Sequence, residues 1–194
     1  MNNLQIQRLL KNHKETRDIF QGVYAKDTLP PHPISTKPSA YICNTDPISK
    51  SGMHWVCFYF PPSGKAEYFD SYGFPPHKIF RKFLGGKRKY TYNKCFIQHP
   101  MTTTCGQYCM YYILRRSQGE SKQEILKFFC DKNSTKISYI NNDLLVVKTI
   151  EKEFHFKSKI FCVKTIKKQF CRYFEDNQKY FRKWAKECKQ SPSK

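Results

Sequence analysis

The chain has 194 residues, of which 35 are Lys or Arg and 15 are Asp or Glu, so its formal net charge is +20. This length favours one domain over residues 1–194, and the 16% aromatic content argues against a disordered chain. No apolar run reaches the roughly 18 residues that a membrane helix needs, and the polar segment 1–15 does not resemble a secretory signal peptide. The classes of protein that remain are a globular enzyme and a module that binds polyanions.

Hydrophobic periodicity and turn residues predict secondary structure in the first half of the chain. The elements are, in chain order, a short amphipathic helix over 4–14, a proline-rich extended segment over 27–38, and strands over 40–43, 54–60 and 66–70. The last two strands are separated by Pro-Pro-Ser-Gly, so they are expected to form a hairpin.

The second half is predicted to be mostly helical. Its elements are a helix over 75–84 that ends at Gly-Gly, a β segment over 90–98, helices over 103–116 and 121–130, and a basic aromatic helix over 165–188. Ser121 and Glu124 have the spacing of a capping box. Strands in the middle with helices at both ends predict an α+β fold, in which helices flank a mixed central sheet.

Positive charge is concentrated in two regions. Residues 71–119 contain nine Lys or Arg and no Asp or Glu, and residues 151–194 contain 13 Lys or Arg against five acids. Such regions can form a surface that attracts phosphate backbones through counterion release, or a solvated face that keeps the protein soluble. For so high a charge on one domain, a nucleic acid is the expected partner.

The nine cysteines are odd in number and include no Cys-X-X-Cys pair, so neither a full disulfide framework nor a zinc site is expected. Most of these thiols are predicted to be buried apolar residues, and one is a candidate nucleophile. That candidate is Cys105, which lies in Thr-Thr-Thr-Cys-Gly directly before the strongest helix prediction. The positive end of a helix dipole favours the thiolate form of a cysteine at that position.

Three further residues complete a candidate catalytic arrangement. His54 begins an aromatic strand and is a candidate base, while Asp70 ends the returning strand of the same hairpin and is a candidate for orienting the imidazole. A tetrahedral intermediate also needs donors to its oxyanion, and the backbone N–H of Cys105 and the side-chain amide of Gln98 are candidates.

Each of these residues also has a simpler interpretation. His54 could be a hydrogen-bonded core histidine, Asp70 a turn residue and Gln98 a surface amide. His99 is closer to Cys105 along the chain, and Cys109, one helical turn after Cys105, is most simply a core residue.

Together, the order and spacing of these residues resemble the adenovirus protease (adenain) family. The matching motifs are Gly-Met-His-Trp at 52–55, Tyr-Phe-Asp-Ser-Tyr-Gly-Phe at 68–74, Gln98, and Thr-Cys-Gly at 104–106. Residues 20–26, 43–45 and 180–182 also resemble segments of that family.

The resemblance implies a papain-like, adenain-like α+β fold in which Cys105 is the nucleophile, His54 the general base and acid, Asp70 the orienting carboxylate and Gln98 the oxyanion donor. The family often has Glu where this chain has Asp70. The resemblance further implies a maturation endopeptidase of an adenovirus, related virus or mobile element. Such an enzyme would cleave capsid and core precursors at Gly-Gly or Gly-X sites, in the virion and the host nucleus.

No metal or other cofactor is implied for the chemistry itself, but viral members of the family are activated by viral DNA and a short basic peptide. The candidate DNA-binding residues are Lys87, Arg88, Lys89, Arg182 and Lys183. The nearest cysteine upstream of Gln98 is Cys95, which does not correspond to the family's peptide-anchoring cysteine. Any activating peptide is therefore expected to bind without a disulfide, and the enzyme is expected to be a monomer.

Two alternatives have their own discriminating features. A protease that deconjugates ubiquitin-like modifiers would share the triad and the Gly-Gly preference, but such enzymes usually carry Asp directly before the nucleophile, where this chain has Thr104. A catalytically dead DNA-binding protein would retain the fold without the chemistry.

Overall fold

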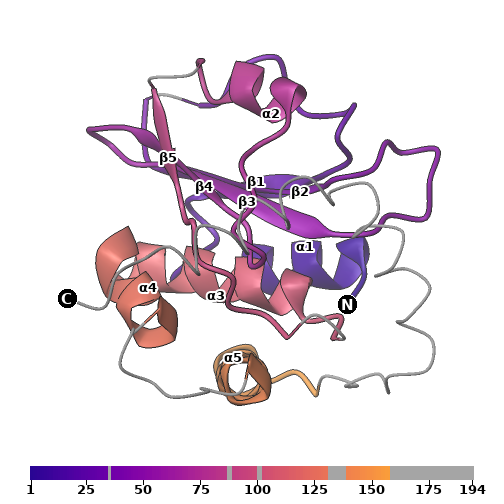
Figure 1. The fold of residues 1–194 in the computed structure, drawn as a ribbon, viewed down its shortest axis with the longest axis vertical. Coiled ribbons are helices and arrows are strands. Elements are labelled where there is room, and N and C mark those ends of the chain that lie inside the picture. Colours follow the sequence, from indigo (N-terminus) through magenta and orange to yellow (C-terminus); the bar gives the residue numbers. More distant parts are fainter. Residues whose placement is uncertain (35, 87–88, 100–101, 131–138, 158–194) are drawn as a thin grey trace, which may run out of the picture.

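The structure is a computed structural model that describes residues 1–34, 36–86, 89–99, 102–130 and 139–157. Five strands form one mixed sheet in the order β1-β2-β3-β4-β5 (Figure 1), and the predicted α+β fold is confirmed. The strands are β1 (Phe20–Tyr24), β2 (Ser39–Asn44), β3 (Trp55–Phe60), β4 (Ala66–Phe69) and β5 (Tyr90–Tyr92). The pairs at the two edges, β1–β2 and β4–β5, are parallel, and the two central pairs are antiparallel.

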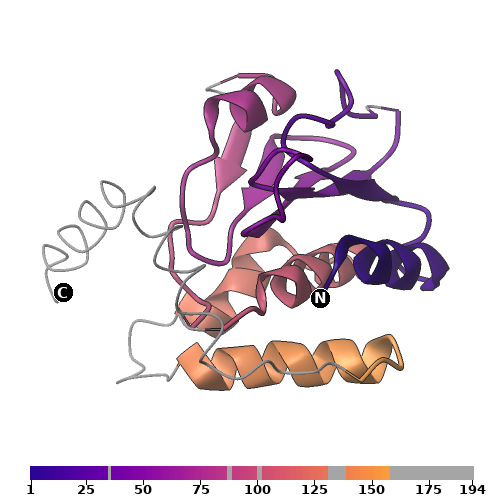
Figure 2. The same cartoon turned by 90° about the vertical axis from the view of Figure 1, so that its right-hand side faces the viewer.

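Five helices surround this sheet within the described residues. They are α1 (Asn3–Asn12), α2 (Lys78–Phe83), α3 (Cys105–Ser117), α4 (Lys122–Cys130) and α5 (Tyr139–Glu153). Figure 2 shows α2 on one side of the sheet, α1 and α3 on the other, and α5 beyond α3. None of the helices in the described ranges has both the length and the apolar character required to cross a membrane.

Alternation along β3 explains why both faces of the sheet carry a core. Phe58 points to the α2 side, where its ring meets Phe80 and Phe83 edge-on at centroid distances of 5.4 and 5.3 Å. Its neighbours Cys57 and Tyr59 belong to the second core, which faces α3. A strand that is buried on both faces is expected to be almost continuously apolar, as the sequence Trp-Val-Cys-Phe-Tyr-Phe is.

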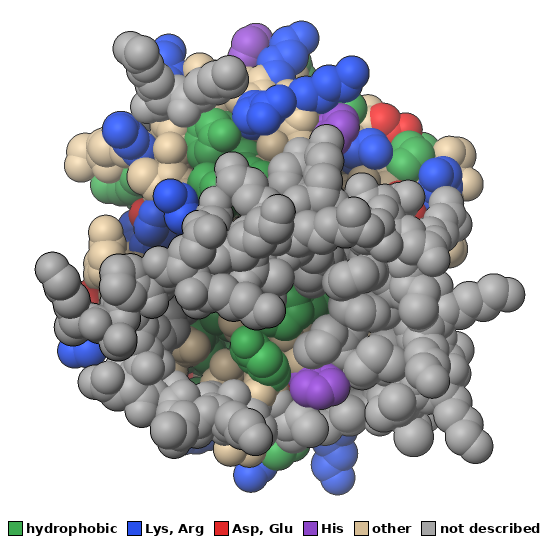
Figure 3. All heavy atoms as spheres, viewed as in Figure 1, with side chains coloured by type: hydrophobic (Ala, Val, Ile, Leu, Met, Phe, Trp, Pro, Cys, Tyr) green, Lys and Arg blue, Asp and Glu red, His purple; other side chains and the backbone are tan. Residues whose placement is uncertain are grey.

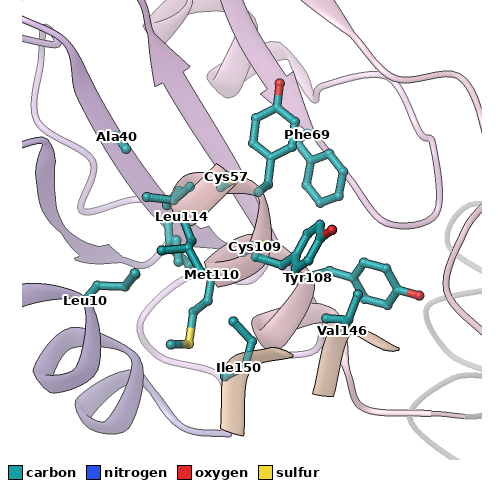
Figure 4. Close-up of a cluster of buried hydrophobic side chains, with 14 of the residues drawn as sticks. Leu10, Ala40, Cys57, Phe69, Tyr108, Cys109, Met110, Leu114, Val146 and Ile150 are labelled. Carbon is teal, nitrogen blue, oxygen red and sulfur yellow. The ribbon is translucent and has the colours of Figure 1, made fainter. Parts of the chain in front are cut away.

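The α3 helix lies between the sheet and α5, and its residues from Cys105 to Leu114 are all buried. Figure 4 shows α3 side chains such as Cys109 between Phe69 of the sheet and Val146 and Ile150 of α5. A helix that is covered on both sides needs apolar residues all round rather than on one stripe. This burial makes the start of α3 a rigid support for Cys105.

A buried ion pair ties the last turns of α3 to the sheet. The Arg116 Nε lies 3.0 Å from Glu67 Oε2, and the Tyr112 hydroxyl donates to the same oxygen at 2.7 Å. The Arg116 guanidinium also lies over the Tyr59 ring, 4.4 Å from its centroid. Because a buried carboxylate is costly unless it is paired and hydrogen-bonded, these contacts fix how α3 sits on β4.

Most predicted elements are present, with shifted ends. The capping box at α4 is confirmed, since Ser121 N–H donates to Glu124 and Glu124 N–H donates to Ser121 Oγ. The predicted β segment over 90–98 is wrong beyond Tyr92, because Asn93 bonds both the N–H and the C=O of Asp70 and draws the chain out of the sheet. The helix predicted over 165–188 lies outside the described residues, and a single domain over 1–194 stays a prediction.

The turn that follows Asp70 depends on a glycine at position 73, and a substitution there tests this. Its φ of +69° is in the left-handed region, and a Cβ there would lie 2.7 Å from the Cys95 carbonyl oxygen. We expect Gly73→Ala to lower the free energy of unfolding by about 2–3 kcal/mol, measured by chemical denaturation.

Gly64→Ala is the matched control, because Gly64 has a φ of +93° with no atom within 4 Å of the added Cβ. It is expected to cost only about 1 kcal/mol. Equal losses in the two variants would contradict the close approach at Gly73.

Candidate active site

The candidate catalytic residues lie at the ends of three elements that the core brings together. His54 directly precedes β3, Asp70 directly follows β4, and Cys105 is the first residue of α3. The antiparallel pairing of β3 with β4 places Cys57 opposite Phe69, so His54 and Asp70 come to the same end of the hairpin. The packing of α3 under these strands adds the third residue.

His54 is held between a carboxylate and a thiol. Its Nε2 lies 2.8 Å from Asp70 Oδ1, and both side chains are almost fully buried. A side-chain hydrogen bond joins the ring to Cys105, for which Nδ1 is the remaining nitrogen. The Tyr72 ring stacks on the imidazole at a centroid distance of 4.8 Å, so the ring plane is fixed as well. The predicted association of these three residues is present in the structure.

Opposing effects set the protonation of His54. Burial lowers its pKa, but the charge and hydrogen bond of Asp70, together with those of Cys105, raise it to about 10. Asp70 Oδ1 is itself fixed by the backbone N–H of Tyr72, which donates to it at 2.8 Å. The imidazole is therefore held as a cation beside the sulfur at neutral pH.

Cys105 has the complementary shift. Burial raises its pKa, but the hydrogen bond and charge of His54 and a hydrogen bond from the Trp55 backbone N–H outweigh burial, and the net pKa is lowered. A lowered thiol pKa beside a cationic imidazole is the condition for a thiolate nucleophile.

The other free cysteines of the described residues are Cys43, Cys57 and Cys109, all of which are buried. Burial raises the pKa of Cys43 and Cys109, so Cys105 has the opposite shift, and a hydrogen bond joins the thiols of Cys57 and Cys109 inside the core. Cys95 is disulfide-bonded. The interpretation of Cys109 as a core residue is confirmed.

The thiol and the imidazole open onto a cleft of about 660 Å³. One wall is formed by β1, the end of β2 and the loop before β3, and the other by the start of α3. The lining includes Val23, Asn44, Met53, Trp55 and Tyr72. Polar residues that point at a pocket with apolar walls are typical of a substrate site.

Gln98 does not line this cleft. Its side chain is fully buried, with Nε2 donating to the Thr102 carbonyl at 2.9 Å and to the Tyr72 hydroxyl at 3.2 Å, while Oε1 accepts from Ser71 at 2.6 Å. Because the Tyr72 ring stacks on the His54 imidazole, the hydrogen bond from Gln98 to the Tyr72 hydroxyl connects Gln98 to the candidate catalytic residues. Its role as an oxyanion donor stays a prediction.

The candidate DNA-binding residues are only partly within the described chain. Lys89 is exposed, whereas Lys87, Arg88, Arg182 and Lys183 lie outside the described residues. Figure 3 shows Lys and Arg side chains gathered on the part of the surface where α2 lies. The residues there include Lys78, Arg81 and Lys82.

Sequence reasoning missed several supporting residues. Asn93 fixes the backbone of Asp70, and Asp143 of α5 accepts hydrogen bonds from the segment before Cys105. The polar run Asn-Asn-Asp at 141–143 was the only signal for the latter, since buried polar residues at the start of a helix usually have partners nearby. In the described residues no group of three or more His, Cys, Asp or Glu could hold a metal ion.

A thiol hydrogen-bonded to an imidazole, which is hydrogen-bonded in turn to a buried carboxylate, is the arrangement that nucleophilic cysteine enzymes use. Comparisons with known proteins support a protease. Residues 20–94 match the model of the adenovirus endoprotease family, a range that contains His54 and Asp70 and ends before Cys105. The chain is thus similar to the adenovirus protease family over this part of its length.

The chain is 27% identical over 134 residues to the protease of fowl adenovirus A serotype 1. That alignment covers 59% of this chain and 63% of the fowl adenovirus protein.

Two solved structures are also similar. A protease of ASFV matches with a TM-score of 0.40 and 21% identity, over 55% of this chain and 43% of that one. The central domain of an uncharacterized Legionella pneumophila protein matches with a TM-score of 0.42 and 16% identity, over 80% of this chain and 97% of that domain. Both TM-scores are below 0.5, so these likenesses add nothing about function.

The two pKa shifts predict how thiol reactivity depends on pH. The thiolate–imidazolium pair exists between the lowered pKa of Cys105 and the pKa of His54 at about 10. Alkylation by iodoacetamide should therefore stay fast below pH of about 8.5, where a free thiol loses reactivity. Asp70→Asn removes the charge that raises the His54 pKa, so the curve should move to higher pH.

Mass spectrometry of the alkylated protein identifies the reacting cysteine. Cys105→Ala should abolish the fast reaction, and Cys109→Ala, one turn away in the core, should leave it unchanged. Fast labelling that survives in Cys105→Ala would contradict this assignment.

Proposed function

We propose that this protein is a cysteine endopeptidase that matures viral precursor proteins by cutting at Gly-Gly or Gly-X sites. The observation that carries the proposal is the Cys105–His54–Asp70 chain at the edge of a cleft. The relationship to the adenovirus protease family supports the substrate class and its setting in the virion and host nucleus.

In the proposed acyl-transfer reaction, Cys105 acts as the nucleophile and His54 carries the protons. The Cys105 thiolate attacks the scissile carbonyl, and the negative charge moves to the carbonyl oxygen. As the tetrahedral intermediate collapses, the C–N bond breaks and His54 gives its proton to the leaving amine, which leaves a thioester on Cys105. His54 then takes a proton from water, whose oxygen attacks the thioester and releases the acid and the thiol.

Asp70 keeps the imidazole oriented and stabilises its cationic form through both half-reactions. The oxyanion would be stabilised by the backbone N–H of Cys105 at the positive end of α3. Gln98 is the proposed second donor, and to act as one its amide would exchange the hydrogen bond to Tyr72 for one to the oxyanion. No metal or organic cofactor enters these steps.

DNA is proposed as an activator on the basis of charge. The formal charge is +20, and the acid-free stretch 71–119 contributes Lys78, Arg81, Lys82 and Lys89 to one region around α2. Lys87, Arg88, Arg182 and Lys183 stay candidate DNA-binding residues outside the described part of the chain. A short activating peptide, if used, would bind without a disulfide to this chain.

The function is tested by a peptide library with Gly-containing sites, read by mass spectrometry. We expect cleavage after Gly, and a loss of at least about a thousandfold in kcat/KM in Cys105→Ala, because removal of a nucleophile leaves only weak residual catalysis. Cys109→Ala is the matched control and should remain active.

The same assay separates the alternatives. Hydrolysis of a ubiquitin-like-modifier conjugate without cleavage of precursor peptides would instead indicate a deconjugating protease. DNA binding with no turnover of either substrate would indicate a catalytically dead protein.

DNA activation is tested by measuring kcat/KM with and without duplex DNA over a range of salt concentrations. Stimulation should fall steeply with salt, because each neutralised phosphate adds about 0.9 to the slope of log affinity against log salt. Replacement of Lys78, Lys82 and Lys89 by Ala should reduce that slope.

Lys127, Lys148 and Lys152 are exposed on α4 and α5, so replacement of these three by Ala is the charge-matched control. Activity that ignores DNA at low salt would contradict the proposal of an activator, and equal slopes for the two sets of variants would contradict the surface around α2.

A further inference from the structure

Asp143 of α5 is a buried carboxylate that the mechanism above does not use. Its side chain is only 5% exposed, and it accepts three hydrogen bonds. Oδ1 accepts from the Tyr108 hydroxyl at 2.9 Å and from the His99 backbone N–H at 3.2 Å, and Oδ2 accepts from the Thr102 hydroxyl at 2.5 Å. Because a carboxylate inside a protein is costly without such donors, apolar packing alone would not require an acid here.

Two of these donors, His99 and Thr102, come from the part of the chain that joins the two predicted oxyanion donors, and the third, Tyr108, belongs to α3. We call residues 97–99 and 102–104 the Gln98 segment, since it contains Gln98 and ends directly before Cys105. The neighbour of Asp143, Asn142, donates to the Ile97 carbonyl at 3.0 Å. Two successive residues of α5 thus hold both parts of this segment.

At the Gln98 end, the link runs through Thr102. The Gln98 amide donates to the Thr102 carbonyl at 2.9 Å, while the Thr102 hydroxyl contacts Asp143. A shift of Thr102 would therefore also move the amide of Gln98.

At the Cys105 end of the segment, the Thr102 hydroxyl is the hydrogen-bond partner of the Thr104 side chain. Thr104 is the N-cap residue of α3, a position from which a Thr hydroxyl ordinarily accepts from a first-turn N–H. Here Thr104 makes no side-chain cap hydrogen bond, and its Oγ1 lies 3.1 Å from Thr102 Oγ1. The Thr102 hydroxyl has two acceptors, the Asp143 carboxylate at 2.5 Å and the His99 carbonyl at 2.9 Å. Its proton is used by these acceptors, so Thr104 is the donor in the Thr104–Thr102 contact and its hydroxyl is directed away from the start of α3.

We propose that Asp143 is a positioning residue for the oxyanion site, which holds the Gln98 segment against α5 and keeps the Thr104 hydroxyl away from the first N–H groups of α3. This inference rests on the proposed peptidase function. Asp143 touches neither the cleft nor the reacting atoms, and it acts through Thr102. The backbone that carries Gln98 and leads into Cys105 is then fixed before the negative charge develops, and donors on a fixed backbone lower a barrier because they need not reorganise.

The test compares Asp143→Asn and Thr102→Val with wild type. Asn keeps the shape and one acceptor oxygen but presents an NH₂ group or an uncharged oxygen to Thr102, and Val removes the hydroxyl that links Asp143 to Thr104. Leu144→Ala is the matched control on the same helix, because Leu144 is adjacent in sequence and 40% exposed.

Three measurements are made on each variant with the same Gly-containing sequence. They are kcat and KM for the peptide substrate, normalised to titrated active sites; inhibition by the peptide aldehyde, whose adduct with Cys105 carries an oxyanion-like oxygen; and inhibition by the unreactive peptide amide. The pH dependence of Cys105 alkylation is recorded in parallel, because it reports on the His54–Cys105 pair alone.

For Asp143→Asn and Thr102→Val we expect kcat to fall about 10-fold to 100-fold, with KM and amide inhibition changed less than about threefold. Aldehyde affinity should fall in parallel with kcat/KM, and the alkylation curve should keep its midpoint. Leu144→Ala should match wild type. If Asp143→Asn fails to fold, Thr102→Val decides alone, because it leaves two of the three donors to Asp143, His99 and Tyr108, in place.

The inference is overturned if aldehyde and amide inhibition weaken equally, if the alkylation midpoint moves, or if both variants match Leu144→Ala in an active protein. A wild-type protein that neither cleaves the peptide nor binds the aldehyde rejects the proposed function itself, and the inference with it.

Discussion

The hydrogen bond between His54 and Asp70 is the interaction on which the rest of the site depends. Both side chains are buried, so without the carboxylate the desolvated imidazole would be neutral and the adjacent thiol protonated. With Asp70 in place, the charge on His54 is retained and the pKa of Cys105 is lowered. Three features keep these two groups together. They are the register of the β3–β4 hairpin, the hydrogen bonds of Asn93 to the Asp70 backbone, and the stacking of the Tyr72 ring on His54.

The position of α3 explains how a reactive thiol can be held so rigidly. Covered by the sheet on one side and by α5 on the other, this helix carries Cys105 at its first position and has little freedom to move. The Glu67–Arg116 pair fixes its far end, and the contacts of Asp143 fix the segment that leads into it. The α5 helix thus contributes to the site although none of its described residues lines the cleft.

Much of the local structure could be predicted from the sequence, but its boundaries and edge elements could not. The hairpin and the helices at 105–117 and 122–130 have strong periodicity, turn and capping signals that act over a few residues. The strand β1 and the helix α5 were missed, because Phe20–Tyr24 contains a glycine and Tyr139–Glu153 begins with polar residues. Their formation depends on pairing with β2 and packing on α3, which are contacts distant in the sequence.

By itself, the sequence determined which residue types were available and in what order, and from these the nucleophile, the imidazole and the carboxylate could be named, because helix starts and hairpin ends are local features. Only the tertiary structure decided that Cys105 has a lowered pKa and that the Gln98 amide points toward Thr102 and Tyr72. It also decided that Asp143 holds the Gln98 segment, which leads into Cys105. These properties arise from burial and from charges brought together across elements. No short stretch of chain encodes them, since the desolvation of a group depends on everything that packs around it.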